Sequence, residues 1–360
     1  MTNSLSLKID RIAEGLTRWP FKNWNFGDSV GFESLLIASK ATGNPRWEEF
    51  ATAWFRSWAT RAEPFARLDC TAPGTAMVQI AGKTEDPVLI QALTNLAAYL
   101  RQRPLLRGAY ETWESSPLLP SYGPSPMAEW EKELLSSPPP GVFLDCLHFD
   151  PPFFTSLGAL LDDKDLIREG VSQAVAYCEI LQTGPGLFDH FVLRGVEGTF
   201  GPGWGRGQGW ALLGLLDTIE FASPYLSRLP ELTDSIEILT KSLQRLAQAQ
   251  IDHQRNDGHW SAVVTDENSG IESSTAAFMA HGFHRGRKLG LLDDSAVATS
   301  IDRAQEAIEK SLDDEGHLSQ VSAAVFACTS AEHYSFVPRN KIVPWGQGPA
   351  LMALANQMDE

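Results

Sequence analysis

The sequence lacks long apolar runs and has few cysteines. No stretch of its 360 residues is apolar for long enough to span a bilayer, and residues 1–12 have no apolar core of the kind found in secretory signals. The four cysteines, Cys70, Cys146, Cys178 and Cys328, are widely separated and show no metal-binding spacing. We therefore expect free, buried thiols in a protein of the reducing cytoplasm.

Positive charge is also scarce. Lysine and arginine number 29 against 45 acidic residues, which gives a net charge of −16. Such a surface repels nucleic acid and anionic membranes, so both are excluded as partners. An anionic substrate would have to be small or meet a local cation. A homo-oligomer is compatible with this composition.

Several catalytic signatures are absent. The chain contains no Walker loop, no zincin motif and no Ser-His-Asp pattern, and no strand precedes its glycine-rich segment. Alternation of apolar and polar residues, typical of strands, is rare. A dinucleotide-binding fold is therefore improbable, and neither a metal nor an organic cofactor is predicted.

Helical periodicity fills most of the chain, and two kinds of helix alternate. One kind is amphipathic, and the other is small and apolar throughout, as expected for outer and inner helices of a closed double ring. We predict an all-α fold, an (α/α)6 barrel of helical hairpins. The expected helices cover residues 4–17, 28–42, 45–62, 72–82, 86–102, 145–161, 164–182, 206–222, 228–250, 272–289, 294–312 and 346–358.

A proline-rich stretch at about 104–141 interrupts the helical pattern. Long loops inside compact domains are usually functional or linkers. Because helices of the same two kinds continue on both sides, we interpret this stretch as a loop over the mouth of the ring. The sequence then predicts a single domain over residues 1–360.

The most informative segment is Gly203-Trp204-Gly205-Arg206-Gly207-Gln208-Gly209-Trp210, which leads into an apolar helix. Glycines allow close backbone approach, and a helix start presents free N–H groups. An arginine offers a planar fork to a carboxylate, and flat aromatic rings suit the apolar face of a sugar. The segment predicts a site for an anionic sugar. The alternative is a glycine-rich turn whose tryptophans fill the core.

Two aspartates each stand just before an expected inner helix. Asp145 is flanked by apolar residues, so its carboxyl group would be desolvated, which favours the protonated form that a proton donor needs. Asp69 is placed similarly, and the two could share a proton. The alternative for both residues is helix capping.

Other polar residues are less informative. His190 could orient a substrate hydroxyl or carboxylate, or bond a loop carbonyl. Glu272 is interpreted as structural. The cluster around Asp257 and His259 resembles a metal site, but Asn256-Asp257-Gly258 is a turn signature, so no metal is predicted there.

Taken together, these segments resemble the unsaturated glucuronyl and rhamnogalacturonyl hydrolases, glycoside hydrolase families 88 and 105. Trp204-Gly205-Arg206-Gly207-Gln208-Gly209-Trp210 is similar to the Trp-x-Arg-Gly-Asn-Gly-Trp of the rhamnogalacturonyl branch. The ordered matches cover most of the chain: residues 24–31, 69–74, Asp145 with 152–154, 187–190, 204–210, 257–260, 272–276 and 344–348.

The resemblance implies the same double ring and an unusual reaction. Such enzymes act on oligosaccharides, here disaccharide-sized, that polysaccharide lyases leave with a 4,5-unsaturated uronic acid. An aspartic acid protonates C4, water adds at C5, and the hemiketal opens and releases the next sugar. The resemblance makes Asp145 the general acid and Asp69 its partner. Contacts with the uronate or its ring are carried over to His190, Trp204, Arg206, Trp24, Phe26, Gln208 and Trp210.

The chain departs from the family pattern at Gln208, where asparagine is expected, and at His148 and Phe149. Three other functions stay open. An inverting glycosidase would use Asp145 as acid and Asp69 as base. A sugar 2-epimerase would need paired histidines, for which only His148 and His190 are available. A non-catalytic carbohydrate binder would have no need for buried acids. The sugar beside the uronate, from pectin, ulvan or a glycosaminoglycan, is left open too.

Overall fold

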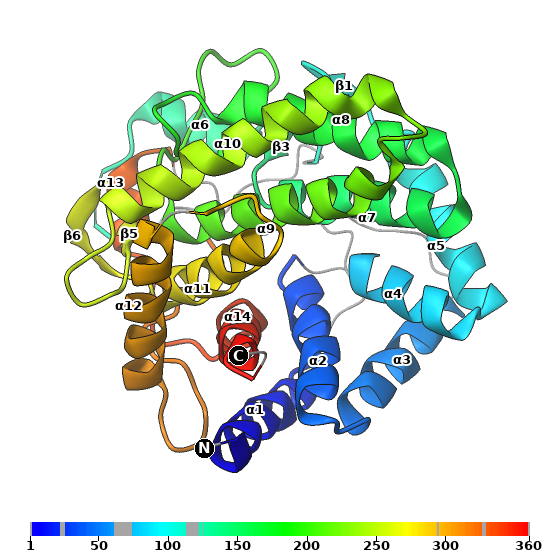
Figure 1. Ribbon diagram of the computed structural model, residues 1–360. Helices are drawn as coiled ribbons and strands as arrows, with labels where there is room; N and C mark the ends of the chain where they lie inside the picture. The colour runs from blue at the N-terminus through cyan, green and yellow to red at the C-terminus, as the bar shows by residue number, and fades with distance from the viewer. Residues whose placement is uncertain are drawn as a thin grey trace.

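The chain forms one ring of helices inside another (Figure 1). The computed structural model describes residues 2–21, 26–60, 74–112, 122–124, 126–293, 295–325 and 329–358. Six helices of these ranges make the inner ring: α2 (Asp28–Thr42), α4 (Gly74–Thr84), α7 (Cys146–Leu161), α9 (Gly205–Ala222), α11 (Ser273–Lys288) and α14 (Pro344–Asn356). Each packs against the next, and α14 packs against α2, which closes the ring.

The outer ring is built from the helices that alternate with these in the chain. They are α1 (Thr2–Thr17), α3 (Arg46–Ala59), α5 (Pro87–Leu100), α8 (Lys164–Leu181), α10 (Thr233–Asp252) and α12 (Ser295–Ser311). The predicted (α/α)6 barrel is therefore confirmed. No helix within the described ranges is long and apolar enough to cross a membrane.

Burial explains why the two rings differ in sequence. In α9 every residue is buried except Glu220 and Phe221, because neighbouring helices surround it. Gly214 lies so close to the backbone of α7 that a Cβ atom would come 2.6 Å from the carbonyl carbon of Leu147. The outer α10, in contrast, buries a single stripe at helical spacing, as expected of a helix with one wet face. Its large apolar members are Ile236, Leu239, Leu243 and Leu246.

Local signals set several helix ends. The side chain of Asp163 accepts hydrogen bonds from the N–H groups of Asp165 and Leu166 and so caps α8. Asp86 caps α5, whose first residue is Pro87. Several predicted boundaries differ from the observed ones by two or three residues, and the predicted start of α10 was wrong by five (228 against 233). Residues 228–232 form a turn and a short 3-10 helix (Pro230–Leu232), and α10 begins only at Thr233.

The proline-rich stretch contains more regular structure than a loop. Its described residues form a small hairpin, β1 (Leu105–Leu106) with β2 (Ala109–Tyr110), and the helix α6 (Glu129–Ser136). Leu135 of α6 packs in a small apolar cluster with Phe143 and Phe191. The segment therefore lies beside the strands β3 (Gly141–Phe143) and β4 (Phe191–Leu193), which pair antiparallel.

The N-terminal ends of several inner helices meet at one end of the ring. Arg206 at the start of α9 faces Glu272, which precedes α11. It also lies against the ring of Trp345 at the start of α14. Trp345 in turn packs so tightly on Gly27, just before α2, that a Cβ atom there would clash with it. The strand pair β5 (Ser261–Val263) and β6 (Asp266–Ile271) and the helix α13 (Ala331–Ser335) lie in the loops around this end.

Candidate active site

Asp145 precedes α7 but does not cap it. It occupies the N-cap position, yet its side chain makes no capping hydrogen bond. Its carboxyl group is 13% exposed, and Oδ2 lies 3.3 Å from Nε2 of His190. The ladder between β3 and β4 fixes this pair, because the N–H of Leu144 donates to the carbonyl of His190 at 2.8 Å. Asp145 therefore stands at the N-cap position without a capping hydrogen bond, and its carboxyl group faces His190 instead.

His190 is held on all sides. Its Nδ1 lies 2.7 Å from the hydroxyl oxygen of Tyr334, and its ring centre is 4.3 Å from that of Trp204. The residue is 2% exposed. The sequence predicted His190 as a site residue but gave no signal for Tyr334, which lies 144 positions further along the chain. The imidazole thus faces Asp145 with one nitrogen and a buried phenol with the other.

Arg206 is fully buried between two tryptophans. Its guanidinium lies 4.9 Å from the ring centre of Trp204 and 5.7 Å from that of Trp345. Nη2 donates to the carbonyl of Ala323 at 3.0 Å, and Nη1 donates to the carbonyl and hydroxyl oxygens of Ser322. These donors hold the 322–323 segment rather than an open space. A direct contact between Arg206 and a substrate carboxylate stays a prediction.

The positive charge of Arg206 nevertheless interacts with the carboxyl groups of the site. Burial lowers the pKa of this arginine, while Glu272 and Asp145 act in the opposite direction. Because an arginine starts from a pKa above 12, it keeps its charge. Glu272 balances this charge at 3.6 Å and accepts a hydrogen bond from the N–H of Ser322 at 3.2 Å. The structural interpretation of Glu272 is confirmed, and Arg206 supplies a fixed positive potential near Asp145.

Gln208 and Trp210 lie deeper than the sequence suggested. The amide of Gln208 bonds both the N–H and the carbonyl of Phe188, at 2.8 and 2.9 Å. Trp210 is 0% exposed and stacks against His148, with ring centres 5.4 Å apart. The observed partners of both side chains are protein groups that shape the base of the site. A contact between either side chain and the substrate stays a prediction, because the distances above are all to protein groups.

Phe26 stands at the rim of the site. It is half-buried, and its ring lies 4.9 Å from that of Trp345. Phe26 is thus the one described member of the predicted pair Trp24 and Phe26, and it packs on Trp345 of α14, which the sequence did not predict as a ring contact. Trp24 and Asp69, the other residues predicted there, lie outside the described residues.

A second polar cluster crosses the interior of the ring below the site. His148 of α7 faces Glu33 of α2 at 3.2 Å and Asp217 of α9 at 3.7 Å. Glu33 also accepts a hydrogen bond from Thr75 of α4 at 2.7 Å. Burial alone would lower the pKa of His148, but the two carboxylates outweigh it and raise that pKa above its usual value. His148 is thus bound within the ring, and the sequence gave no sign of its partners.

The same cluster bears on the epimerase alternative. In the described part of the chain, His148 is engaged by Glu33 and Asp217, whereas His190 is engaged by Asp145 and Tyr334. The two imidazoles therefore belong to separate clusters and do not form the histidine pair that a sugar 2-epimerase needs.

A cavity opens on the opposite side of the cluster from Asp145. It has a volume of about 310 Å³ and is lined by residues of five inner helices, among them Glu33, Asp217, His281 and Arg285. Arg285 binds Asp217 at 2.7 Å and Glu220 at 2.5 Å. Burial, with help from Arg285, lowers the pKa of His281 to about 3, so this imidazole is neutral. Arg285, Asp217 and Glu220 are therefore paired with one another at this end.

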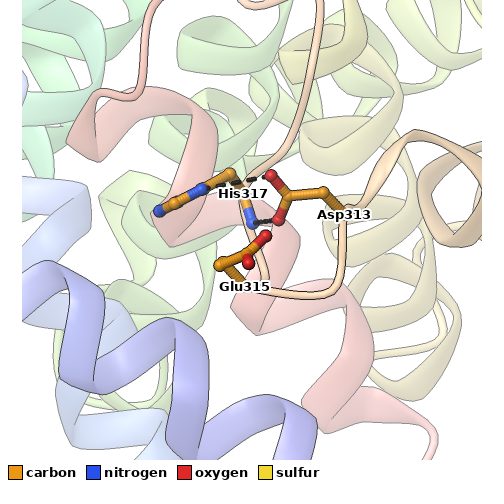
Figure 2. Close-up of side chains that lie close together, drawn as sticks. All are labelled: Asp313, Glu315 and His317. Carbon is orange, nitrogen blue, oxygen red and sulfur yellow. Dashed lines mark hydrogen bonds and ion pairs between the residues drawn. The ribbon is translucent and has the colours of Figure 1, made fainter.

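Within the described ranges, one group of side chains has metal-ligand spacing (Figure 2). Asp313, Glu315 and His317 bring their ligand atoms within 4.8 Å of one another. They lie on an exposed hairpin, where the carboxylate of Asp313 already accepts a hydrogen bond from the backbone N–H of His317 at 2.7 Å.

The predicted turn at Asp257 is confirmed, since its carboxylate accepts a hydrogen bond from the backbone N–H of His259 at 3.0 Å.

The fold is a closed (α/α)6 ring, and at one end of it lie the carboxyl group of Asp145, aromatic rings and a buried arginine. Residues 9–359 match Glycosyl Hydrolase Family 88. The chain therefore belongs to this family and is a glycoside hydrolase.

Individual relatives agree with this assignment. The chain is 24% identical over 356 residues to the unsaturated rhamnogalacturonyl hydrolase YesR of Bacillus subtilis (strain 168), covering 97% of this chain and 93% of that protein. A crystal structure from Salmonella enterica, described as a possible member of the GH105 family, has a TM-score of 0.82 at 18% identity over 100% of this chain and 94% of that one. The unsaturated glucuronyl hydrolase from Bacillus sp. GL1 has a TM-score of 0.64 at 19% identity, covering 98% and 95%. The two structures support the fold.

Proposed function

We propose that this protein removes a 4,5-unsaturated uronic acid from the non-reducing end of oligosaccharides by hydrating its vinyl ether bond. The observation that carries the proposal is Asp145: a nearly buried carboxyl group at a helix start, without a capping bond and 3.3 Å from a buried imidazole. Such a group can hold a proton away from water and deliver it to a bound sugar.

In the proposed reaction the protonated Asp145 donates its proton to C4 of the unsaturated ring. The positive charge that develops at C5 is quenched by a water molecule, whose proton returns to the carboxylate. The product is a hemiketal, which opens to a ketone and breaks the bond to the next sugar. Arg206 would hold the substrate carboxylate electrostatically, and Trp204 and Phe26 would face the ring. Asp69 is the proposed partner of Asp145.

The proposed substrates are products of polysaccharide lyases. The similarity to YesR and the Trp204–Trp210 segment favour an unsaturated galacturonyl disaccharide ending in rhamnose as the first one to test. A cytoplasmic location is part of the same proposal, because such disaccharides would be imported before hydrolysis. Recovery of the native protein from a secreted fraction would contradict that location.

Loss of ultraviolet absorbance tests the chemistry directly, because hydration destroys the conjugated double bond. We expect the wild type to remove the ultraviolet absorbance of the disaccharide. The rate of this loss should be about 10²–10⁴-fold lower in Asp145→Asn, the usual contribution of a general acid. Asp163→Asn is the matched control. It also changes an N-cap aspartate, but that residue caps the outer helix α8, where asparagine is an equally good cap.

Two results would contradict the proposal. If the wild type leaves the chromophore of every uronyl disaccharide intact, the hydration reaction is wrong, and saturated glycosides become the test substrates for an inverting glycosidase. If Asp145→Asn is as active as Asp163→Asn, the reaction can stand but Asp145 is not its acid.

A further inference from the structure

Tyr334 is a buried residue beside the site that the proposed reaction does not yet use. It lies on α13, in the segment between α12 and α14, and is 1% exposed. Its hydroxyl oxygen is 2.7 Å from Nδ1 of His190, and its ring centre lies 6.1 Å from that of Trp204. A phenol fully removed from water usually has a hydrogen-bond partner, and here that partner is the imidazole that faces Asp145.

The backbone next to this contact leaves room for the hydroxyl group. Gly201 has a φ of +67°, and a Cβ atom there would meet the Tyr334 hydroxyl and come 2.7 Å from Cβ of His190. Glycine alone combines that backbone conformation with the absence of a side chain. The His190 N–H donates to the carbonyl of Phe200 at 2.8 Å, so the imidazole and the glycine turn are fixed to each other.

The chemistry of the two ring nitrogens connects Tyr334 to Asp145. When the Tyr334 O–H donates to Nδ1, a neutral imidazole carries its proton on Nε2, which faces Oδ2 of Asp145 at 3.3 Å. This arrangement suits an ionised carboxylate. When Asp145 is protonated, the order can reverse, because a hydroxyl group can also accept from Nδ1–H. Phenylalanine can do neither.

We propose that Tyr334 is a positioning residue for the hydration step, acting through His190 on Asp145. The inference rests on the proposed function, in which Asp145 first donates a proton and then recovers one from water. Tyr334 lets the imidazole follow both protonation states without leaving a buried nitrogen unpaired. Among the described residues, Arg206 of α9 and, behind it, Glu272 also carry charge near this group, and Asp69 is the further carboxyl group that the proposed function places there.

The test compares Tyr334→Phe with Tyr110→Phe. Both changes remove a hydroxyl group that makes a 2.7 Å hydrogen bond, but the partner of Tyr110 is Glu169 on the outer helix α8. We expect the maximal kcat of Tyr334→Phe on the unsaturated disaccharide to fall about tenfold, as for one lost hydrogen bond, while KM stays within about twofold. Only Tyr334→Phe changes the hydrogen bonding of the imidazole that faces Asp145. The pH profile of kcat should therefore change in Tyr334→Phe and stay that of the wild type in Tyr110→Phe.

Gly201→Ala gives a second perturbation, because its Cβ atom would displace the hydroxyl group and press on Cβ of His190 while the phenol is kept. It should reproduce the loss of kcat and the change of the pH profile. An active wild type with unchanged kcat and pH profile in both variants would overturn the role of Tyr334 alone. A loss of kcat that follows thermal stability and leaves the pH profile unchanged would do the same. An inactive wild type would overturn this inference together with the proposed function.

Discussion

Replacing Glu33 with glutamine should separate the charge of the buried cluster from its shape. The side chain of Glu33 is 11% exposed, faces His148 at 3.2 Å and accepts a hydrogen bond from Thr75 at 2.7 Å. Glutamine keeps an acceptor for Thr75 but removes the charge that faces His148. Removing one partner of a buried ion pair costs about 3–5 kcal/mol, because the other charge is left uncompensated. We expect about 3 kcal/mol, since Asp217 still faces the imidazole at 3.7 Å.

The pH dependence follows from the pKa shifts. The pKa of His148 is raised in the folded state, so its stabilisation is fully present below the usual value of about 6.5 and is lost as the pH rises through the raised pKa. Burial opposes the shift of Glu33, but His148 and Thr75 lower its pKa overall. The contribution of Glu33 is therefore present above about pH 4.5 and is lost as the pH falls through the lowered pKa.

Urea denaturation at pH 5.5 and at pH 8.5 measures both effects. Glu33→Gln should lose about 3 kcal/mol at pH 5.5 and clearly less at pH 8.5, where His148 gives up its proton more easily. Glu231→Gln is the matched control. It breaks an exposed pair with Arg168 at 2.8 Å, and such pairs contribute at most about 1 kcal/mol. A loss below about 1 kcal/mol at pH 5.5, or an equal loss at both pH values, would refute this reasoning.

Two further predictions concern packing and cysteine reactivity. Gly214→Ala should destabilise the protein by about 3 kcal/mol, because its Cβ atom would meet the Leu147 backbone. Gly15→Ala, at an exposed position of α1 with no neighbouring atom within 4 Å, should stabilise the protein by about 0.5–1 kcal/mol. Equal denaturation midpoints for the two variants would contradict the close packing of α7 and α9. Cys146 and Cys178 are buried thiols, and burial raises the pKa of Cys178 to about 11. Iodoacetamide at pH 8 should therefore label these two only after unfolding, and labelled peptides from folded protein would show that this interior opens readily.

The ring architecture could be predicted because local sequence patterns, the apolar periodicity of each helix and the residues just before it, indicate the two kinds of helix. Inner helices are apolar throughout, and glycine, proline or aspartate stands at or just before their first residues. The expected segments 28–42 and 206–222 therefore agree closely with α2 and α9. The small elements were missed for a physical reason. Each strand of β3 and β4 spans three residues, too few for alternation to be visible. The single domain expected over residues 1–360 stays a prediction.

The site was predicted in part, and the missing part is long-range. Asp145 and His190 were identified from their own neighbourhoods, and the structure places them together. Tyr334 and Ser322 had no local signal, because their partners lie 144 and 116 positions away. The burial of Arg206 was missed for the same reason. Only closure of the ring brings the 322–323 segment over its guanidinium.

The closure of the inner ring has a consequence for synthesis of the chain. Helix α14 lies between α11 and α2, so the last wall of the ring joins elements from opposite ends of the sequence (Figure 1). Until residues 344–356 leave the ribosome, the apolar faces of α2 and α11 have no partner on that side. Such non-local closure slows folding and prolongs exposure of apolar surface. Nascent chains that stop before residue 344 should therefore depend on chaperones, and chains that include residues 344–356 should leave the chaperone when α14 docks between α11 and α2.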